Sequence, residues 1–227
     1  MRNQGLLTAV LAAGASALAY SRWVKPWQER WGATDEEIAL PLPGDGLVEE
    51  PALQVTRAIT IHASREEVWP WIVQLGADRG GFYTYDPLEN LLGLDIHSAD
   101  GIVEGWQGLE VGDVVHADRA RTAGWYVVEL RPNEALVLKV GDLAAGRPLR
   151  RDEKLRWEFL WTFALRTTPG GGTRLLVRER VAFDSAITRT LMAPVGVVSF
   201  VMTRGMMLGI KSRAEAVRAR SSIFEPT

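Results

Sequence analysis

Large apolar residues alternate with polar residues along two long segments in the C-terminal half of the chain, and this period of two predicts β-strands. The segments cover residues 155–167 and 173–183, and the sequence PGGG at 169–172 between them is typical of a turn. They therefore predict a β-hairpin with one apolar face. The inward-facing residues of its first strand are Trp157, Phe159, Trp161, Phe163 and Leu165.

Shorter extended segments precede the hairpin and are separated from one another by turn residues. They cover residues 54–61, 113–117, 124–131 and 135–140. Neighbouring strands joined by short turns pair in antiparallel fashion. Together with the hairpin, these segments predict one antiparallel sheet.

Short helices are predicted where the Ser/Thr-x-x-Glu pattern of a capping box occurs, at Thr34 and at Ser64. The second helix is expected to run to Gly76 with a kink at Pro70, because proline removes a backbone hydrogen bond. A further short helix is expected over residues 86–92. Two short helices are thus predicted between the strand at 54–61 and the main run of strands.

A long C-terminal helix is predicted over residues 186–220, with an early break at Pro194. Its first half has the apolar composition of a membrane span, but Arg204 lies within it and polar residues dilute it. We therefore expect this helix to pack against the sheet rather than to cross a membrane.

The N-terminus is apolar and uncharged over residues 5–20, which is short for a span of about 20 residues. Extension to residue 24 admits Arg22, whose charge can reach the headgroups. Trp23, Trp27 and Trp31 follow at helical spacing, as in an interfacial belt, although Pro26 is expected to interrupt the helix. We expect a single membrane anchor formed by residues 5–24, with the domain on the cytoplasmic side because basic residues follow the apolar run.

Two other interpretations of the N-terminus stay open. The first is a signal peptide, cleaved near Ala19 after an A-x-A sequence, which would give a secreted protein. The second is a helix that lies flat or packs on the domain.

Residues 41–51 are rich in proline, glycine and acidic residues and are expected to form a linker. The expected organisation is an apolar segment with a Trp-rich flank at 1–31, a short helix and linker at 32–52, one domain at 53–220 and a tail at 221–227.

Composition excludes several classes of function. The formal charge of −2 gives no overall attraction to nucleic acid, whose binders need clustered basic surface, and the absence of cysteine excludes disulfides, thiolate metal sites and a cysteine nucleophile. The three histidines, His62, His97 and His116, lack the spacing of metal ligands. We expect no metal, no cofactor and no nucleic-acid partner, and a protein partner stays open.

Several short sequences resemble a known superfamily. They are VWPWIVQLG at 68–76, DRGGFY at 78–83, LEN at 88–90, IHSAD at 96–100, WQ at 106–107, VGD at 111–113 and MLGIK at 207–211. The chain from about residue 55 to 218 is similar to a bacterial branch, of mostly unassigned function, of the START-like, pollen-allergen-like SRPBCC superfamily, to which polyketide cyclases also belong. The resemblance implies an α+β helix-grip fold, in which a curved antiparallel sheet with two short helices wraps around a long C-terminal helix and encloses an apolar cavity.

Candidate ligand-binding residues fall into two groups. A glycine-rich, irregular region is expected to form the cavity mouth and to supply polar groups, with structural pairing as the alternative. The sheet and the last helix are expected to supply apolar walls, with a filled core as the alternative. The first group is Arg79, Tyr83, Tyr85, Glu89, His97 and Trp106; the second is Trp157, Phe159, Trp161, Met202 and Met206.

Three functions follow from this picture. The first is a membrane-tethered binding or transfer protein for a lipid or other apolar small molecule. The second is a cyclase-like or aromatase-like enzyme on an apolar substrate, which would need a polar residue deep in the pocket. No catalytic residue is assigned; the titratable residues available are His97, Glu89, Asp100, Glu158 and Glu179. The third is a protein-interaction module with a packed interior.

Overall fold

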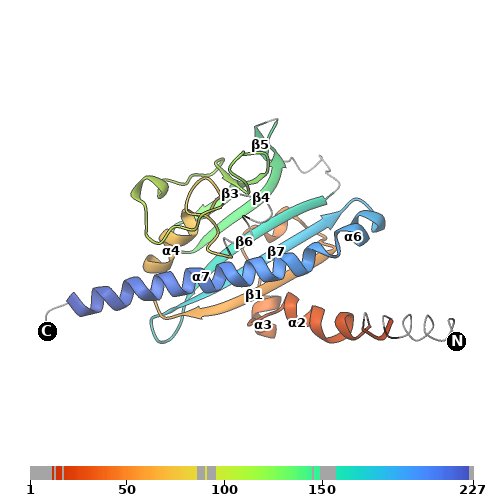
Figure 1. The fold of residues 1–227 in the computed structure, drawn as a ribbon, viewed down its shortest axis with the longest axis horizontal. Coiled ribbons are helices and arrows are strands. Elements are labelled where there is room, and N and C mark those ends of the chain that lie inside the picture. The colour runs from red at the N-terminus through yellow and green to blue at the C-terminus, as the bar shows by residue number, and fades with distance from the viewer. Residues whose placement is uncertain are drawn as a thin grey trace.

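The protein is an α+β structure in which one long helix lies across a curved antiparallel sheet (Figure 1). The computed structural model describes residues 12, 14–16, 18–85, 90, 96–144, 146–148 and 157–224. Within these residues the sheet has the strand order β1-β7-β6-β4-β3-β2, and β5 pairs with β4 at its side. The strands are β1 (Leu53–Ile61), β2 (Val114–His116), β3 (Gly124–Arg131), β4 (Ala135–Asp142), β5 (Arg147–Pro148), β6 (Trp157–Thr167) and β7 (Thr173–Phe183).

The predicted hairpin is present as β6 and β7. The two strands pair in antiparallel register from Trp157 opposite Phe183 to Thr167 opposite Thr173. β1, although it comes early in the chain, pairs with the other edge of β7, so β7 lies inside the sheet between β1 and β6. The predicted antiparallel sheet is therefore confirmed, and the short strand β5 is an addition to it.

Both faces of the sheet are covered, because side chains alternate along each strand. On the concave face, Phe163 and Val177 pack with Met207 of the long helix in the main apolar core. On the opposite face, Leu176 packs with Leu42 from the segment before β1. The sheet therefore lies between the C-terminal helix and the N-terminal part of the chain.

Both capping boxes are present at the starts of the predicted helices. Thr34 accepts the amide hydrogen bond of Glu37 at the start of α3 (Asp35–Ala39), and Ser64 opens α4 (Arg65–Val73) in the same way. α4 contains Pro70 and ends at Val73, three residues earlier than expected, because Gly76 has a positive φ and its backbone pairs with Gly81. The helix expected over residues 86–92 falls outside the described residues except for Asn90.

The C-terminal helix is broken as expected at Pro194, between α6 (Ala186–Met192) and α7 (Val195–Phe224). The side chains of Met206, Met207, Ile210 and Ala214 are fully buried against the core. Among the described residues, Val195–Ala219 is the one helical stretch long and apolar enough to cross a membrane by length and composition. The part of the helix that carries the buried side chains packs against the sheet as predicted, but the start of α7 does not, because Val195, Val197, Val198 and Val201 are exposed.

The N-terminal region remains helical at Pro26. The chain continues from the π-helix η1 (Tyr20–Val24) directly into α2 (Lys25–Glu29), and Pro26 lies in the first turn of α2. The expected interruption is therefore wrong: the missing amide is accommodated by the wider π-type hydrogen bonding before the proline. Trp23 and Trp27 are exposed, whereas Trp31 packs against the core, so the expected tryptophan stripe is divided. Most of the apolar run at 5–17 lies outside the described residues.

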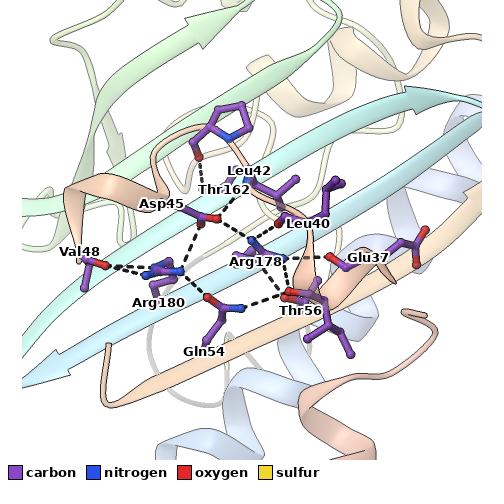
Figure 2. A network of polar contacts seen from close by, with 12 residues as sticks. Glu37, Leu40, Leu42, Asp45, Val48, Gln54, Thr56, Thr162, Arg178 and Arg180 are labelled. Carbon is purple, nitrogen blue, oxygen red and sulfur yellow. Dashed lines mark hydrogen bonds and ion pairs between the residues drawn. The ribbon is translucent and has the colours of Figure 1, made fainter. Parts of the chain in front are cut away.

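Residues 41–51 were expected to be a linker, but the segment at 40–49 is folded against the sheet (Figure 2). The short 3-10 helix η2 (Asp45–Leu47) places Asp45 Oδ2 2.7 Å from Nη1 of Arg178, whose side chain is 1% exposed. Arg178 also donates to the carbonyl oxygens of Glu37, Ile38 and Leu40. The linker interpretation fails here because the turn-forming residues make a fixed path that buries Leu42 and Val48.

Candidate ligand cavity

A cavity of about 400 Å³ lies between the concave face of the sheet, the α6–α7 corner and the N-terminal helix. Its sheet wall is aromatic and its helix wall is aliphatic. The sheet contributes Trp125, Trp157, Phe159 and Trp161, and the helices contribute Met192, Val195 and Met202. Ligand pockets commonly have about 300–1,000 Å³ and a mainly apolar lining. The size and lining therefore fit a small apolar molecule.

The aromatic wall is continuous because inward-facing residues of β6 contact one another and a residue of β3. The ring centroid of Trp161 lies 4.8 Å from that of Phe163, 6.2 Å from that of Phe159 and 5.2 Å from that of Trp125. Trp157 continues the row, 6.0 Å from Phe159. The rings meet in tilted and edge-to-face arrangements, so each ring is held by its neighbours and the wall is closely packed.

An ion pair lies in this otherwise apolar cavity. Nη1 of Arg57 lies 2.7 Å from Oε1 of Glu179, and the two side chains are 2% and 6% exposed. Thr203 donates to the same carboxylate oxygen at 2.8 Å, and Ser199 donates to Oε2 at 2.7 Å. Nε of Arg57 donates to the carbonyl oxygen of Gln28 at 2.9 Å. The buried charges are thus paired and hydrogen-bonded, as burial requires.

The strand register explains why these groups meet. Trp161 on β6 stands opposite Glu179 on β7, and Glu179 in turn stands opposite Val55 on β1. Arg57 is two residues from Val55 and points to the same face, so it is the diagonal neighbour of Glu179. The indole and the carboxylate therefore share one row across β6 and β7, and the guanidinium reaches it from the diagonal position on β1.

The indole nitrogen of Trp161 has no hydrogen-bond partner within the described part of the chain. The residue is 8% exposed, and its Nε1 atom is buried without an acceptor among the described residues. Nε1 of Trp71 is in the same condition, but Trp71 lies in the core and does not line the cavity. Leaving a buried donor unpaired costs about 1–3 kcal/mol. The side chain of Trp161 therefore lines the cavity, while its Nε1 is covered by neighbouring atoms.

The mouth of the cavity lies between the N-terminal helix and the α6–α7 corner. Lys25 and Glu29 border it on one side, and Arg189 and Gly196 border it on the other. The rings of Trp27 and Phe200 lie 5.2 Å apart and hold α2 against α7. Figure 1 shows the N-terminal helix running beside α7 toward the end that carries α6. The N-terminal segment is therefore part of the cavity wall.

The apolar wall residues expected from the sequence are largely brought together here. Trp157, Phe159, Trp161 and Met202 all line the cavity. Met206 is 1% exposed in the main core and does not line it, because it lies one turn further along α7 where the helix meets the sheet directly.

The polar loop residues that were expected at the cavity mouth lie elsewhere. Arg79 donates to the carbonyl oxygen of Trp106, and neither residue lines the cavity. Gln74, fully buried, accepts from the amide of Val103 at 3.1 Å and donates to the carbonyl oxygen of Gly101 at 3.1 Å. Arg79 and Trp106 thus belong to a network that fixes the loop at 101–107, which is the structural alternative considered from the sequence.

The remaining loop residues are also outside the cavity lining. Tyr83 has a positive φ of 57° and lies in the core, where burial raises the pKa of its phenol to about 12. The Tyr85 ring lies against Gly205 of α7, and His97 is exposed. Glu89 falls outside the described residues. The loop still reaches the aromatic wall through Phe82, whose ring centroid lies 6.4 Å from that of Trp161.

Arg57, Glu179, Ser199 and Thr203 were not identified as site residues from the sequence. A signal was present for two of them. Arg57 and Glu179 occupy inward-facing positions of strands whose other inward residues, such as Ile59 and Val177, are apolar. Two residues of opposite charge at such apolar positions on different strands indicate a buried ion pair.

Among the described residues, no group of three or more His, Asp or Glu side chains could hold a metal ion.

No protein-family model and no curated protein matches the chain. Solved bacterial structures are similar to it at low identity. A hypothetical protein from Helicobacter pylori is 10% identical with a TM-score of 0.45, covering 78% of this chain and 96% of that one. A protein of unknown function from Staphylococcus aureus is 13% identical with a TM-score of 0.45, covering 74% and 96%. A protein from Mesorhizobium loti is 15% identical with a TM-score of 0.38, covering 72% and 98%.

Proposed function

We propose that the protein is a membrane-tethered binding or transfer protein that holds a lipid or other apolar small molecule in this cavity. The observation that carries the proposal is a cavity of about 400 Å³ with an aromatic sheet wall and an aliphatic helix wall. A long helix across a curved antiparallel sheet also fits the helix-grip fold implied by the resemblance to the SRPBCC superfamily. An interaction module with a packed interior would have no cavity of this kind between the sheet and the helices.

The membrane part of the proposal is supported by the surface around the cavity mouth. Ile187 and Leu191 of α6 are 73% and 74% exposed, and Trp23 of the N-terminal helix is 71% exposed. Exposed apolar residues gathered in this way are typical of membrane or protein contacts. The uncharged run at 5–20 leads into the same helix, and Arg22 and Lys25 follow it where anionic headgroups would lie. A bilayer on this side would bring the mouth to a reservoir of apolar ligand.

A second candidate function is an enzyme of the cyclase or aromatase type, because Glu179 provides a carboxylate inside the cavity. The hydrogen bonds of the Glu179 carboxylate favour ligand binding without a chemical reaction. Its two oxygens already accept from Arg57, Thr203 and Ser199, so it is committed to an ion pair rather than free to take a substrate proton.

The proposal is tested with Nile red, a neutral apolar fluorophore, titrated into the purified full-length protein. We expect saturable binding at one molecule per chain. Met202→Trp, which places a large ring in the cavity, should abolish this binding. Val217→Trp adds the same ring to α7 at an exposed position that does not line the cavity and should leave binding intact. Equal binding by both variants, or none by the wild type, would overturn the proposal.

A further inference from the structure

We infer that the cavity takes a single-chain amphiphile, whose apolar body lies against the aromatic wall and whose one anionic end, a carboxylate or a phosphate, lies at the mouth against the guanidinium of Arg189. This inference rests on the proposed function and narrows its ligand class.

The charged side chains that line the cavity leave one positive charge unbalanced. They are Lys25, Glu29, Arg57, Glu179 and Arg189, so three cations meet two anions. Nη1 of Arg57 lies 2.7 Å from Oε1 of Glu179, and Nζ of Lys25 lies 3.5 Å from Oε1 of Glu29. Within the described residues, the side chain of Arg189 makes neither a hydrogen bond nor an ion pair. The unbalanced charge is therefore that of Arg189.

The carboxylate nearest to Arg189 along the chain does not neutralise it. Asp184 accepts a hydrogen bond from the hydroxyl of Thr188 at 2.5 Å, and in the described structure it forms no ion pair with Arg189. Arg189 is exposed in the last turn of α6, so its guanidinium is reached from the mouth. A guanidinium offers a planar fork of N–H donors that matches a carboxylate or a phosphate. Arg189 can thus bind an oxyanion without giving up another partner.

The position of the ligand charge follows from the burial of the other ion pair. Arg57 and Glu179 are 2% and 6% exposed and already hold each other, and Ser199 and Thr203 donate to the carboxylate. An ionic end placed beside them would be an additional buried charge without a counter-ion, which is strongly unfavourable. At the mouth the side chain of Lys25 is 49% exposed, so an ionic end keeps contact with water there. The charge is therefore expected at the mouth and the apolar body inside.

The size of the cavity favours one chain over two. Its volume of about 400 Å³ lies near the lower limit of ligand pockets, which have about 300–1,000 Å³. A membrane phospholipid carries two long acyl chains and needs more space than a single chain. An ammonium end on a single chain would meet Arg189 as a like charge. The cavity is therefore expected to select an anionic end over a cationic one.

The test uses probes of one chain length: dodecanoate, dodecyl phosphate, dodecan-1-ol and dodecylammonium, at about pH 8, where the ionic ends are charged. Each displaces Nile red from the purified full-length protein. We expect both anions to bind more tightly than dodecylammonium, and their comparison shows which oxyanion is preferred. Arg189→Gln should weaken both anions roughly 2- to 5-fold, the range of an exposed ion pair, while dodecan-1-ol binds as before. Arg189→Lys should retain part of the affinity for the anions.

Glu29→Gln changes the charge of the lining in the opposite direction. It removes the partner of Lys25, so it should tighten binding of dodecanoate about as much as Arg189→Gln weakens it. Arg166→Gln is the matched control, because it removes the same charge as Arg189→Gln from an exposed position that does not line the cavity. It should leave the affinities for all four probes unchanged.

Several results would overturn the inference while saturable Nile red binding leaves the proposed function standing. One is unchanged affinity for both anions in Arg189→Gln. Another is an equal loss for dodecan-1-ol and dodecanoate in this variant, which would show an effect on the shape of the cavity and not on its charge. Tighter binding of dodecylammonium than of dodecanoate by the wild type is the third. Absence of Nile red binding would instead remove the proposed function.

Discussion

Trp161 of β6 stands directly opposite Glu179 of β7, so that an unpaired indole donor and a buried carboxylate share one row of the concave face. Cross-strand neighbours on one face have Cβ atoms about 4.5–5.5 Å apart. The polar part of the cavity is therefore built into the sheet itself rather than carried by a loop, and its geometry should be insensitive to loop motion.

The ion pair should contribute to stability only as a pair. Glu179→Leu leaves the guanidinium of Arg57 buried without a counter-ion, and we expect a loss of about 3–5 kcal/mol in the free energy of unfolding. The double variant Arg57→Met/Glu179→Leu should recover most of this loss, because no buried charge remains. Urea unfolding followed by circular dichroism measures both. A double variant as unstable as the single one would contradict this explanation.

The ion pair between Asp45 and Arg178 should hold the segment at 40–49 on the sheet. Desolvation lowers the pKa of Arg178, and the nearby carboxylate of Asp45 opposes that shift. Asp45→Asn should therefore destabilise the fold by about 1.5–3 kcal/mol, the range for a hydrogen bond to a charged group. Amide hydrogen exchange should show the loss at Leu42 and Val48 first. Asp35→Asn, at a side chain that is 84% exposed, serves as the control and should change exchange there little.

Stability should depend on Glu37 at acidic pH. A hydrogen bond from Arg174 is the main cause that lowers the pKa of Glu37 below its ordinary value of 4.5. A lowered pKa in the folded state gives stability that is present above the unfolded value and is lost as the pH falls through the folded value. Glu37→Gln should flatten the pH dependence of the unfolding free energy below about pH 5. Glu104→Gln, at an exposed carboxylate, should preserve the slope; identical slopes for all three proteins would contradict the assignment.

The α6–α7 corner should contact the bilayer. The chain contains no cysteine, so one introduced cysteine can carry a fluorophore at a single place. In the full-length protein on phosphatidylcholine–phosphatidylglycerol vesicles, a label at Leu191→Cys should be quenched by lipids with a nitroxide on the acyl chain. A label at Val111→Cys, which is 62% exposed and outside the cavity lining, should not be quenched. Equal quenching at both positions would show that the corner has no special contact with lipid.

The sheet and the terminal helix could be predicted from the sequence because their signals are local. Alternation fixed the inward face of residues 157–165, and Pro194 fixed the break before α7. The segment at 40–49 could not be recognised as folded structure, because its main partner, Arg178, lies 133 residues from Asp45 in the chain. Local turn signals are the same for a linker and for a packed segment.

The cavity was predictable in its apolar part and not in its polar part. The aromatic row of β6 follows from strand periodicity, whereas the pairing of Arg57 with Glu179 depends on the register of β1 on β7. Arg79 and Trp106 were expected at the mouth, but the position of loop residues depends on long-range contacts such as the hydrogen bonds of Gln74. Charged residues at apolar positions of a strand would therefore have been a better guide to the site than polar residues in a glycine-rich loop.

The measurement that tests the central claim most directly is native mass spectrometry of the full-length protein, extracted gently from the membranes of its own host. We expect one apolar molecule per chain, recoverable by organic extraction, which Met202→Trp does not retain and Val217→Trp does. A wild-type protein that carries no bound molecule in this measurement, or a molecule retained equally by Met202→Trp, would contradict the account.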